Sequence, residues 1–141
     1  MFILAINKSN NKETFKKAVR IYLILSAVAI VIDKVYGAFS HGVDSAAMTW
    51  MFLYPLLGGA LFYFIIDKLI PHITKFAGCR VFMNLYNSGI ATFTVGSFLK
   101  GIFEIAGTNS SHLKYYYMTG GAFIVAGLII MFKIAISKDK F

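Results

Sequence analysis

The apolar positions of this 141-residue chain gather into four long runs separated by short polar segments. A membrane-spanning helix needs about 20 mostly apolar residues, and each run reaches that length. The runs lack the period-2 alternation of membrane β-strands. The pattern therefore predicts an all-α integral membrane protein with four transmembrane helices in one bundle. The expected spans are residues 18–39, 46–70, 81–106 and 115–136.

Polar segments flank this transmembrane domain, which we place at residues 18–136. Residues 1–17 are rich in asparagine and lysine, and residues 137–141 hold two further lysines. The basic residues beside the spans divide unevenly between the two sides of the membrane. Eleven of the 14 lie on the side of the chain ends, and three lie opposite: Lys34, Lys100 and Lys114. Because cytoplasmic loops carry an excess of Lys and Arg, we expect both termini to be cytoplasmic.

Composition narrows the class of protein further. Hydrophobic residues make up 58% of the chain and charged residues 14%, which excludes an ordinary soluble domain. The single cysteine, Cys79, excludes an internal disulfide and a thiolate metal cluster. The net charge of +8 fits a membrane surface here, so we expect the lipid bilayer and no nucleic acid as partner. The expected location is the cell membrane, either a bacterial inner membrane or a plasma membrane.

Three charged residues inside the expected spans are the candidate binding residues. A charged side chain near the middle of a spanning helix costs about 2.5 to 3.5 kcal/mol, so Asp33, Lys100 and Glu104 should face other helices. Lys100 and Glu104 are four residues apart and can pair along one helix face. Asp33 needs a partner as well, and Lys100 is the obvious one. We expect the three to converge at a polar site in the outer half of the membrane.

Small residues mark where helices should pack closely. Gly89 and Gly96 lie on one face of the third span, and Gly120 and Gly127 lie in the fourth, so we predict helix contacts there. Pro55, with the nearby Gly58 and Gly59, interrupts the second span. Proline removes a backbone hydrogen bond and kinks a helix, so this stretch is either a packing kink or a hinge.

Two functions remain open at this point. The first is carriage or binding of a small polar or ionic solute at the outer polar site, with a homo-oligomer completing the path. The alternative is a non-catalytic accessory or assembly subunit of a membrane complex, in which the charges are structural ion pairs. We do not expect an enzyme, because phosphate-binding loops and nucleophile motifs are absent from the sequence. We expect no metal and no cofactor, since the three histidines lie in connecting segments without a second histidine nearby.

Overall fold

The computed structural model describes residues 2–76 and 78–137, with side chains from residue 13 onward. All regular structure in these residues is helical, as the sequence predicts. The elements in chain order are α1 (Phe2–Phe39), α2 (Ala46–Thr49), the π-helix η1 (Tyr54–Leu61), α3 (Phe62–Leu69), the 3-10 helix η2 (Ile73–Lys75), α4 (Gly78–Ile105) and α5 (Leu113–Ser137). The backbone of the predicted N-terminal tail is helical from Phe2, whereas residues 138–141 of the C-terminal tail lie outside the described residues.

The four predicted apolar runs correspond to α1, to the interrupted stretch α2–η1–α3, to α4 and to α5. Two stretches of the described chain, Ala46–Leu69 and Leu113–Ser137, are long and apolar enough to cross a membrane. Local signals explain where helices end. Beyond α4, Gly107 adopts a φ of +69°, and the Thr108 N–H donates to the Phe103 carbonyl at 2.9 Å. This is a Schellman motif, in which glycine adopts a left-handed conformation at low cost.

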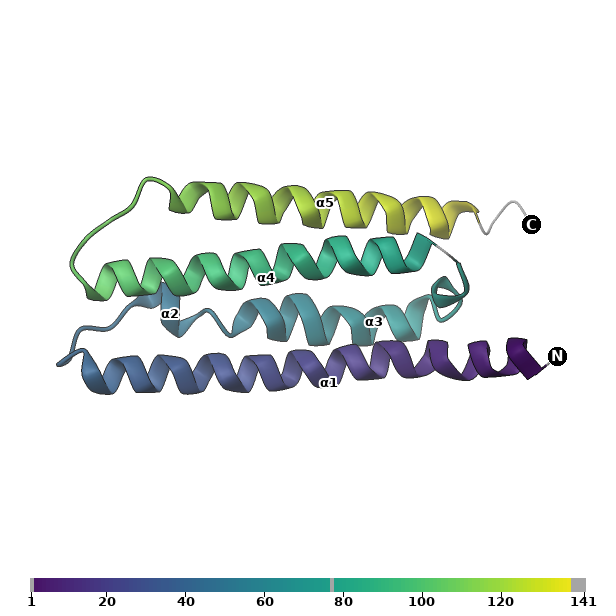
Figure 1. Cartoon of the computed structure of the whole chain (residues 1–141), viewed down its shortest axis with the longest axis horizontal. Helices are drawn as coiled ribbons and strands as arrows, with labels where there is room; N and C mark the ends of the chain where they lie inside the picture. Colours follow the sequence, from purple (N-terminus) through teal and green to yellow (C-terminus); the bar gives the residue numbers. More distant parts are fainter. Residues whose placement is uncertain (1, 77, 138–141) are drawn as a thin grey trace.

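The helices lie side by side in a row, with both termini and the α3–α4 connection at one end (Figure 1). Within the described chain, α1 packs against η1 and α3, and α5 packs on α4. α4 packs against α2 and η1, and it contacts α3 through side chains such as the Tyr86 ring on Phe62. No Cα atom of α1 lies within 8 Å of one in α4 or α5 among these residues. The four helical stretches are therefore arranged as an open row in the described chain.

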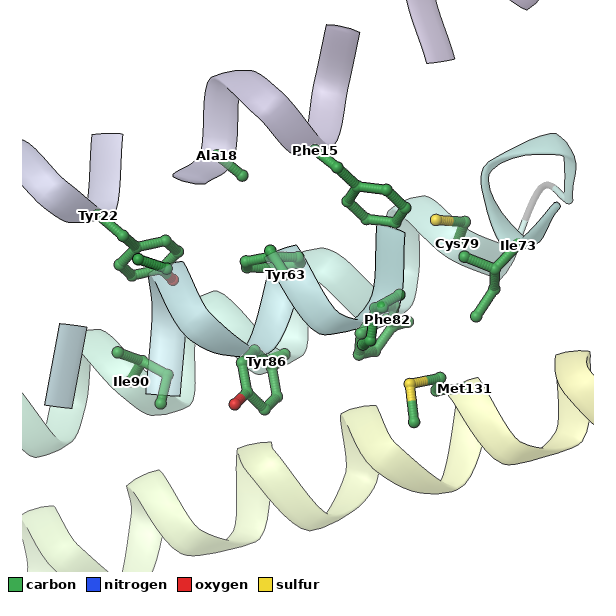
Figure 2. Packing of buried hydrophobic residues seen from close by; sticks show 12 residues of the cluster. Phe15, Ala18, Tyr22, Tyr63, Ile73, Cys79, Phe82, Tyr86, Ile90 and Met131 are labelled. Atoms are coloured by element: carbon green, nitrogen blue, oxygen red, sulfur yellow. The ribbon is translucent and has the colours of Figure 1, made fainter. Parts of the chain in front are cut away.

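An aromatic core joins α1, α3 and α4 in the half of the row nearer the chain ends. Figure 2 shows side chains from α1, α3 and α4 converging around Tyr63, which is fully buried together with Phe15 and Phe82. The rings of Phe62 and Tyr86 stack with their centroids 4.1 Å apart. Cys79 belongs to the same core.

Glycines bring α4 and α5 into close contact. Among the long helices of the described chain, α5 packs on α4 alone. A Cβ atom on Gly89 would lie 2.8 Å from the Gly120 carbonyl oxygen, and one on Gly127 would lie 3.1 Å from the Tyr86 nitrogen. A Cβ atom on Gly96 would lie 3.0 Å from that of Tyr116. All four glycines chosen from the sequence for helix packing thus lie in this one interface.

Replacing Gly89 by alanine should separate α4 from α5, because the backbone oxygen of Gly120 cannot move aside as a flexible side chain could. We expect the free energy of unfolding to fall by about 1 to 3 kcal/mol, as for other overpacked sites. Gly121→Ala is the matched control, because its Cβ would lie 3.9 Å from the nearest atom, on Phe93. The control should gain up to about 1 kcal/mol from helix propensity. Equal unfolding midpoints of the two variants in mixed micelles would contradict this close contact.

Candidate functional site

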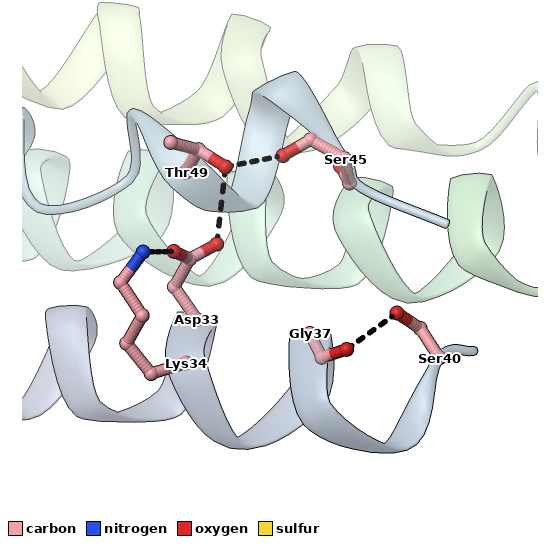
Figure 3. Close-up of polar contacts among 6 residues, drawn as sticks. All are labelled: Asp33, Lys34, Gly37, Ser40, Ser45 and Thr49. Atoms are coloured by element: carbon pink, nitrogen blue, oxygen red, sulfur yellow. Dashed lines mark hydrogen bonds and ion pairs between the residues drawn. The ribbon is translucent and has the colours of Figure 1, made fainter. Parts of the chain in front are cut away.

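The candidate residue Asp33 is held by its own helix and by α2. The Thr49 hydroxyl donates to Asp33 Oδ1 at 3.1 Å, and Lys34 Nζ lies 3.6 Å from Asp33 Oδ2 (Figure 3). The Asp33 side chain is 16% exposed, whereas Lys34 is 79% exposed. The carboxylate therefore faces α2, and the long lysine side chain extends outward from the same ion pair.

The other two candidates, Lys100 and Glu104, pair with each other on α4. Lys100 Nζ lies 3.8 Å from Glu104 Oε1, as the i, i+4 spacing predicts. The Ser45 hydroxyl hydrogen-bonds to Glu104 Oε2. The expected ion pair between Asp33 and Lys100 does not form within the described chain. Asp33 is bound instead by Thr49 of α2 and by Lys34, and Lys100 pairs with Glu104.

These contacts make α2 a bridge between α1 and α4. Ser45, which is 3% exposed, caps α2 by accepting a hydrogen bond from the Met48 N–H at 3.2 Å. Thr49 lies one turn later, with its hydroxyl 3.0 Å from the Ser45 carbonyl oxygen. Ser45, the N-cap of α2, and Thr49, its last residue, thus reach the carboxylates of Glu104 and Asp33 from the two ends of one short helix. We name these five residues, Asp33, Ser45, Thr49, Lys100 and Glu104, the outer polar network.

A second polar cluster lies in the half of the row nearer the chain ends. The hydroxyls of Tyr22 and Tyr63 both donate to Asn87 Oδ1, each at 2.6 Å. One oxygen on α4 is therefore bonded from both α1 and α3. Asn87 and the two tyrosines are not among the candidate residues that the sequence indicated. Their partners are 65 and 24 residues away in sequence, a separation that no local pattern reports.

The residues proposed as a kink or hinge form a closely packed part of η1. A Cβ atom on Gly59 would overlap the Tyr22 ring, and one on Gly58 would lie 2.6 Å from the Ile90 side chain. The Tyr86 hydroxyl donates to the Gly58 carbonyl at 2.6 Å. Pro55, which lacks an N–H, opens this π-helical segment and is buried. The absence of side chains at Gly58 and Gly59 lets side chains of α1 and α4 pack directly against the backbone of η1.

An apolar groove of about 630 Å³ runs between α1 and α4. One face of α1 from Lys17 to Ile32 forms one wall, one face of α4 from Met83 to Phe98 forms the other, and Met51 and Pro55 contribute to its lining. At 1.5 Å per residue, the α1 wall is about 22 Å long. Neither carboxylate of the outer polar network lines the groove, whereas Asn87 and Tyr22 do.

Asn87 presents unpaired donors on the groove wall. Its Oδ1 accepts both tyrosine hydroxyls, and its amide nitrogen bonds to no atom of the described chain. No fully buried side-chain nitrogen or oxygen of the described chain lacks a partner, so this amide nitrogen keeps some exposed surface, and Asn87 as a whole is half-buried. It is a point of hydrogen-bonding chemistry in a groove whose walls are otherwise largely hydrocarbon.

Comparison of the chain with protein-family models, with curated proteins and with solved structures finds no match.

The bridge through α2 can be tested at Ser45. Ser45→Ala removes both the cap of α2 and the hydrogen bond to Glu104, so we expect the free energy of unfolding to fall by about 1 to 3 kcal/mol. Ser111→Ala is the control, because Ser111 is exposed in the α4–α5 connection. Thermal unfolding in detergent micelles would measure both variants. If Ser45→Ala unfolded together with the control, α2 would not join α1 to α4 through this hydroxyl.

Proposed function

We propose that all four helical stretches cross a membrane, with the end that carries both chain termini in the cytoplasm. Large apolar side chains point outward along the row, such as Ile24 at 63%, Val31 at 60% and Met118 at 67% exposure. So much exposed apolar surface suits lipid and not water. The basic residues Lys75 and Arg80 lie at the end of the row that holds the termini, which supports this orientation.

Labelling of single cysteines in intact cells tests this topology, in a Cys79→Ser background. A membrane-impermeant maleimide should label Ser111→Cys directly and Lys75→Cys only after the membrane is permeabilised. Both positions are exposed, so each reports the side of the membrane and not local burial. Labelling of Lys75→Cys alone in intact, sealed cells would mean that the orientation is opposite to the one proposed. Labelling of both positions would contradict the separation of the two ends by a bilayer.

Within the membrane, the protein binds a chain-like hydrophobic molecule in the groove between α1 and α4, and it does so without chemical change to that molecule. The observation that carries this proposal is the unpaired amide of Asn87 on an apolar wall. A donor that faces hydrocarbon without a partner costs free energy, on the order of 1 to 3 kcal/mol. A bound molecule that offers an acceptor beside a long apolar segment removes that cost and also fills the groove.

The size of the groove suits a small ligand with a long apolar part. Its volume of about 630 Å³ lies within the usual range of pockets for small ligands. The α1 wall is about 22 Å long and mostly apolar, so it can accommodate an extended hydrocarbon chain.

The outer polar network takes a structural part in this proposal. Each carboxylate already has a lysine partner and a hydroxyl donor, which is the arrangement expected of ion pairs that join helices. This favours the second of the two functions that the sequence left open, at least for these charges. Carriage of a polar solute has one supporting feature, since the Lys100 and Glu104 side chains are 49% and 38% exposed. Because Lys100 and Glu104 pair with each other, less of their charge is left for a solute to bind.

Filling the groove tests the proposal directly. Ala91→Trp places a large ring on the groove wall, so the purified variant should lose most of the acyl lipid that remains bound to the wild-type protein after detergent washing. Ala122→Trp is the matched control, because Ala122 is exposed on α5 and does not line the groove. Native mass spectrometry would count the bound lipids. Equal retention by the two variants would exclude the groove as the binding site.

A further inference from the structure

We infer that the groove selects an anionic glycerophospholipid, with the lipid phosphate at Lys17, an ester carbonyl at the Asn87 amide and one acyl chain along the α1 wall. This inference rests on the proposed function of the groove and adds the class of ligand. Three features of the described residues support it: a basic recess at the mouth of the groove, the spacing between that recess and Asn87, and the length of the apolar wall.

The mouth of the groove is basic. Lys17 lines the groove and also a neighbouring recess of about 590 Å³ on α1, which is lined in addition by Glu13, Thr14, Lys16 and Arg20. Three cationic side chains against one carboxylate give this recess a net positive charge. Lys16, Lys17 and Arg20 form no ion pair within the described chain. Basic pockets at the cytoplasmic ends of spanning helices suit anionic lipid head groups.

The spacing of the polar groups matches the order of groups in a glycerophospholipid. In such a lipid the ester carbonyls lie between the phosphate and the acyl chains. Along α1, Tyr22 lies five residues beyond Lys17, which is about 7.5 Å. The Tyr22 hydroxyl is bonded to Asn87, so the free amide donors lie next to that level of the groove. A lipid with its phosphate at Lys17 therefore places an ester carbonyl near Asn87.

The remaining wall accommodates the acyl chain. Beyond Tyr22 the α1 side of the groove consists of apolar side chains, from Leu25 to Ile32. Half of a hydrocarbon core measures about 15 Å, which corresponds to ten helical residues. Counted from the predicted start of the first span at Ala18, that distance ends at Val28. The groove thus follows one leaflet from the interface to the middle of the bilayer and slightly further.

Four lipids with hydrocarbon chains of equal length provide the probes for a test on the full-length protein in neutral detergent. They are diester phosphatidylglycerol, diester phosphatidylcholine and the diether analogue of each, and binding is measured by native mass spectrometry. We expect the diester phosphatidylglycerol to bind best. Lys17→Gln should lower its affinity about fivefold, the effect expected for one basic residue near a membrane surface. Loss of the ester carbonyl in the diether analogue should lower it by a few-fold, as for one hydrogen bond.

Lys133→Gln is the control, because Lys133 is exposed near the same end of the row but does not line the groove. Equal losses in Lys17→Gln and Lys133→Gln would mean general attraction to the basic end and would overturn the inference. Equal binding of phosphatidylglycerol and phosphatidylcholine would overturn it as well. If Ala91→Trp still displaced both lipids, the proposed function would stand without selectivity, whereas binding unaffected by Ala91→Trp would remove the groove itself.

Discussion

The side-chain oxygen Oδ1 of Asn87 is the point on which the half of the molecule nearer the chain ends depends. It accepts hydrogen bonds from Tyr22 on α1 and Tyr63 on α3, so one atom of α4 fixes the positions of two other helices. Tyr22 and Tyr63 are both buried, so water does not compete for these bonds and they are stronger than in solution. The tyrosine that reaches across from α1 also keeps the two backbones apart. The same interaction therefore ties α1 to α4 and leaves the space between them that forms the groove.

Hydropathy predicted four helical stretches and the end of each to within one residue, because the length of an apolar run is a local property. It did not predict that α1 begins at Phe2, since residues 2–17 are largely polar. Gly107 likewise follows α4 as a helix-ending glycine, and the pairing of Lys100 with Glu104 follows from their spacing alone. The order of the helices in space could not be predicted from the sequence. An apolar face looks the same whether it meets lipid or another helix, so the sequence could not distinguish an open row from a closed bundle.

The partners of the polar side chains were also beyond local patterns. Asp33 was expected to reach Lys100, yet the short helix α2 lies between them and supplies Thr49. Nothing in the apolar run at residues 46–70 indicated that its first turn would separate from the rest. The role of Asn87 was missed for a similar reason, since an asparagine becomes a junction only when two distant tyrosines meet it. Long-range pairing of this kind is a property of the folded arrangement.

The turn at residues 50–52 and the π-helical stretch η1 together set the relationship between the two polar regions. They lie between Ser45 and Thr49, which face the outer charges, and Tyr63, which faces Asn87. A π-helical segment contains the equivalent of one extra residue in an α-helix. Within the helical part, one residue fewer would turn everything before it by about 100° relative to Tyr63. The stretch from α2 to α3 can therefore contact α1 and α4 at both ends only while the turn and η1 keep their number of residues, which makes its length, more than its flexibility, the property under constraint.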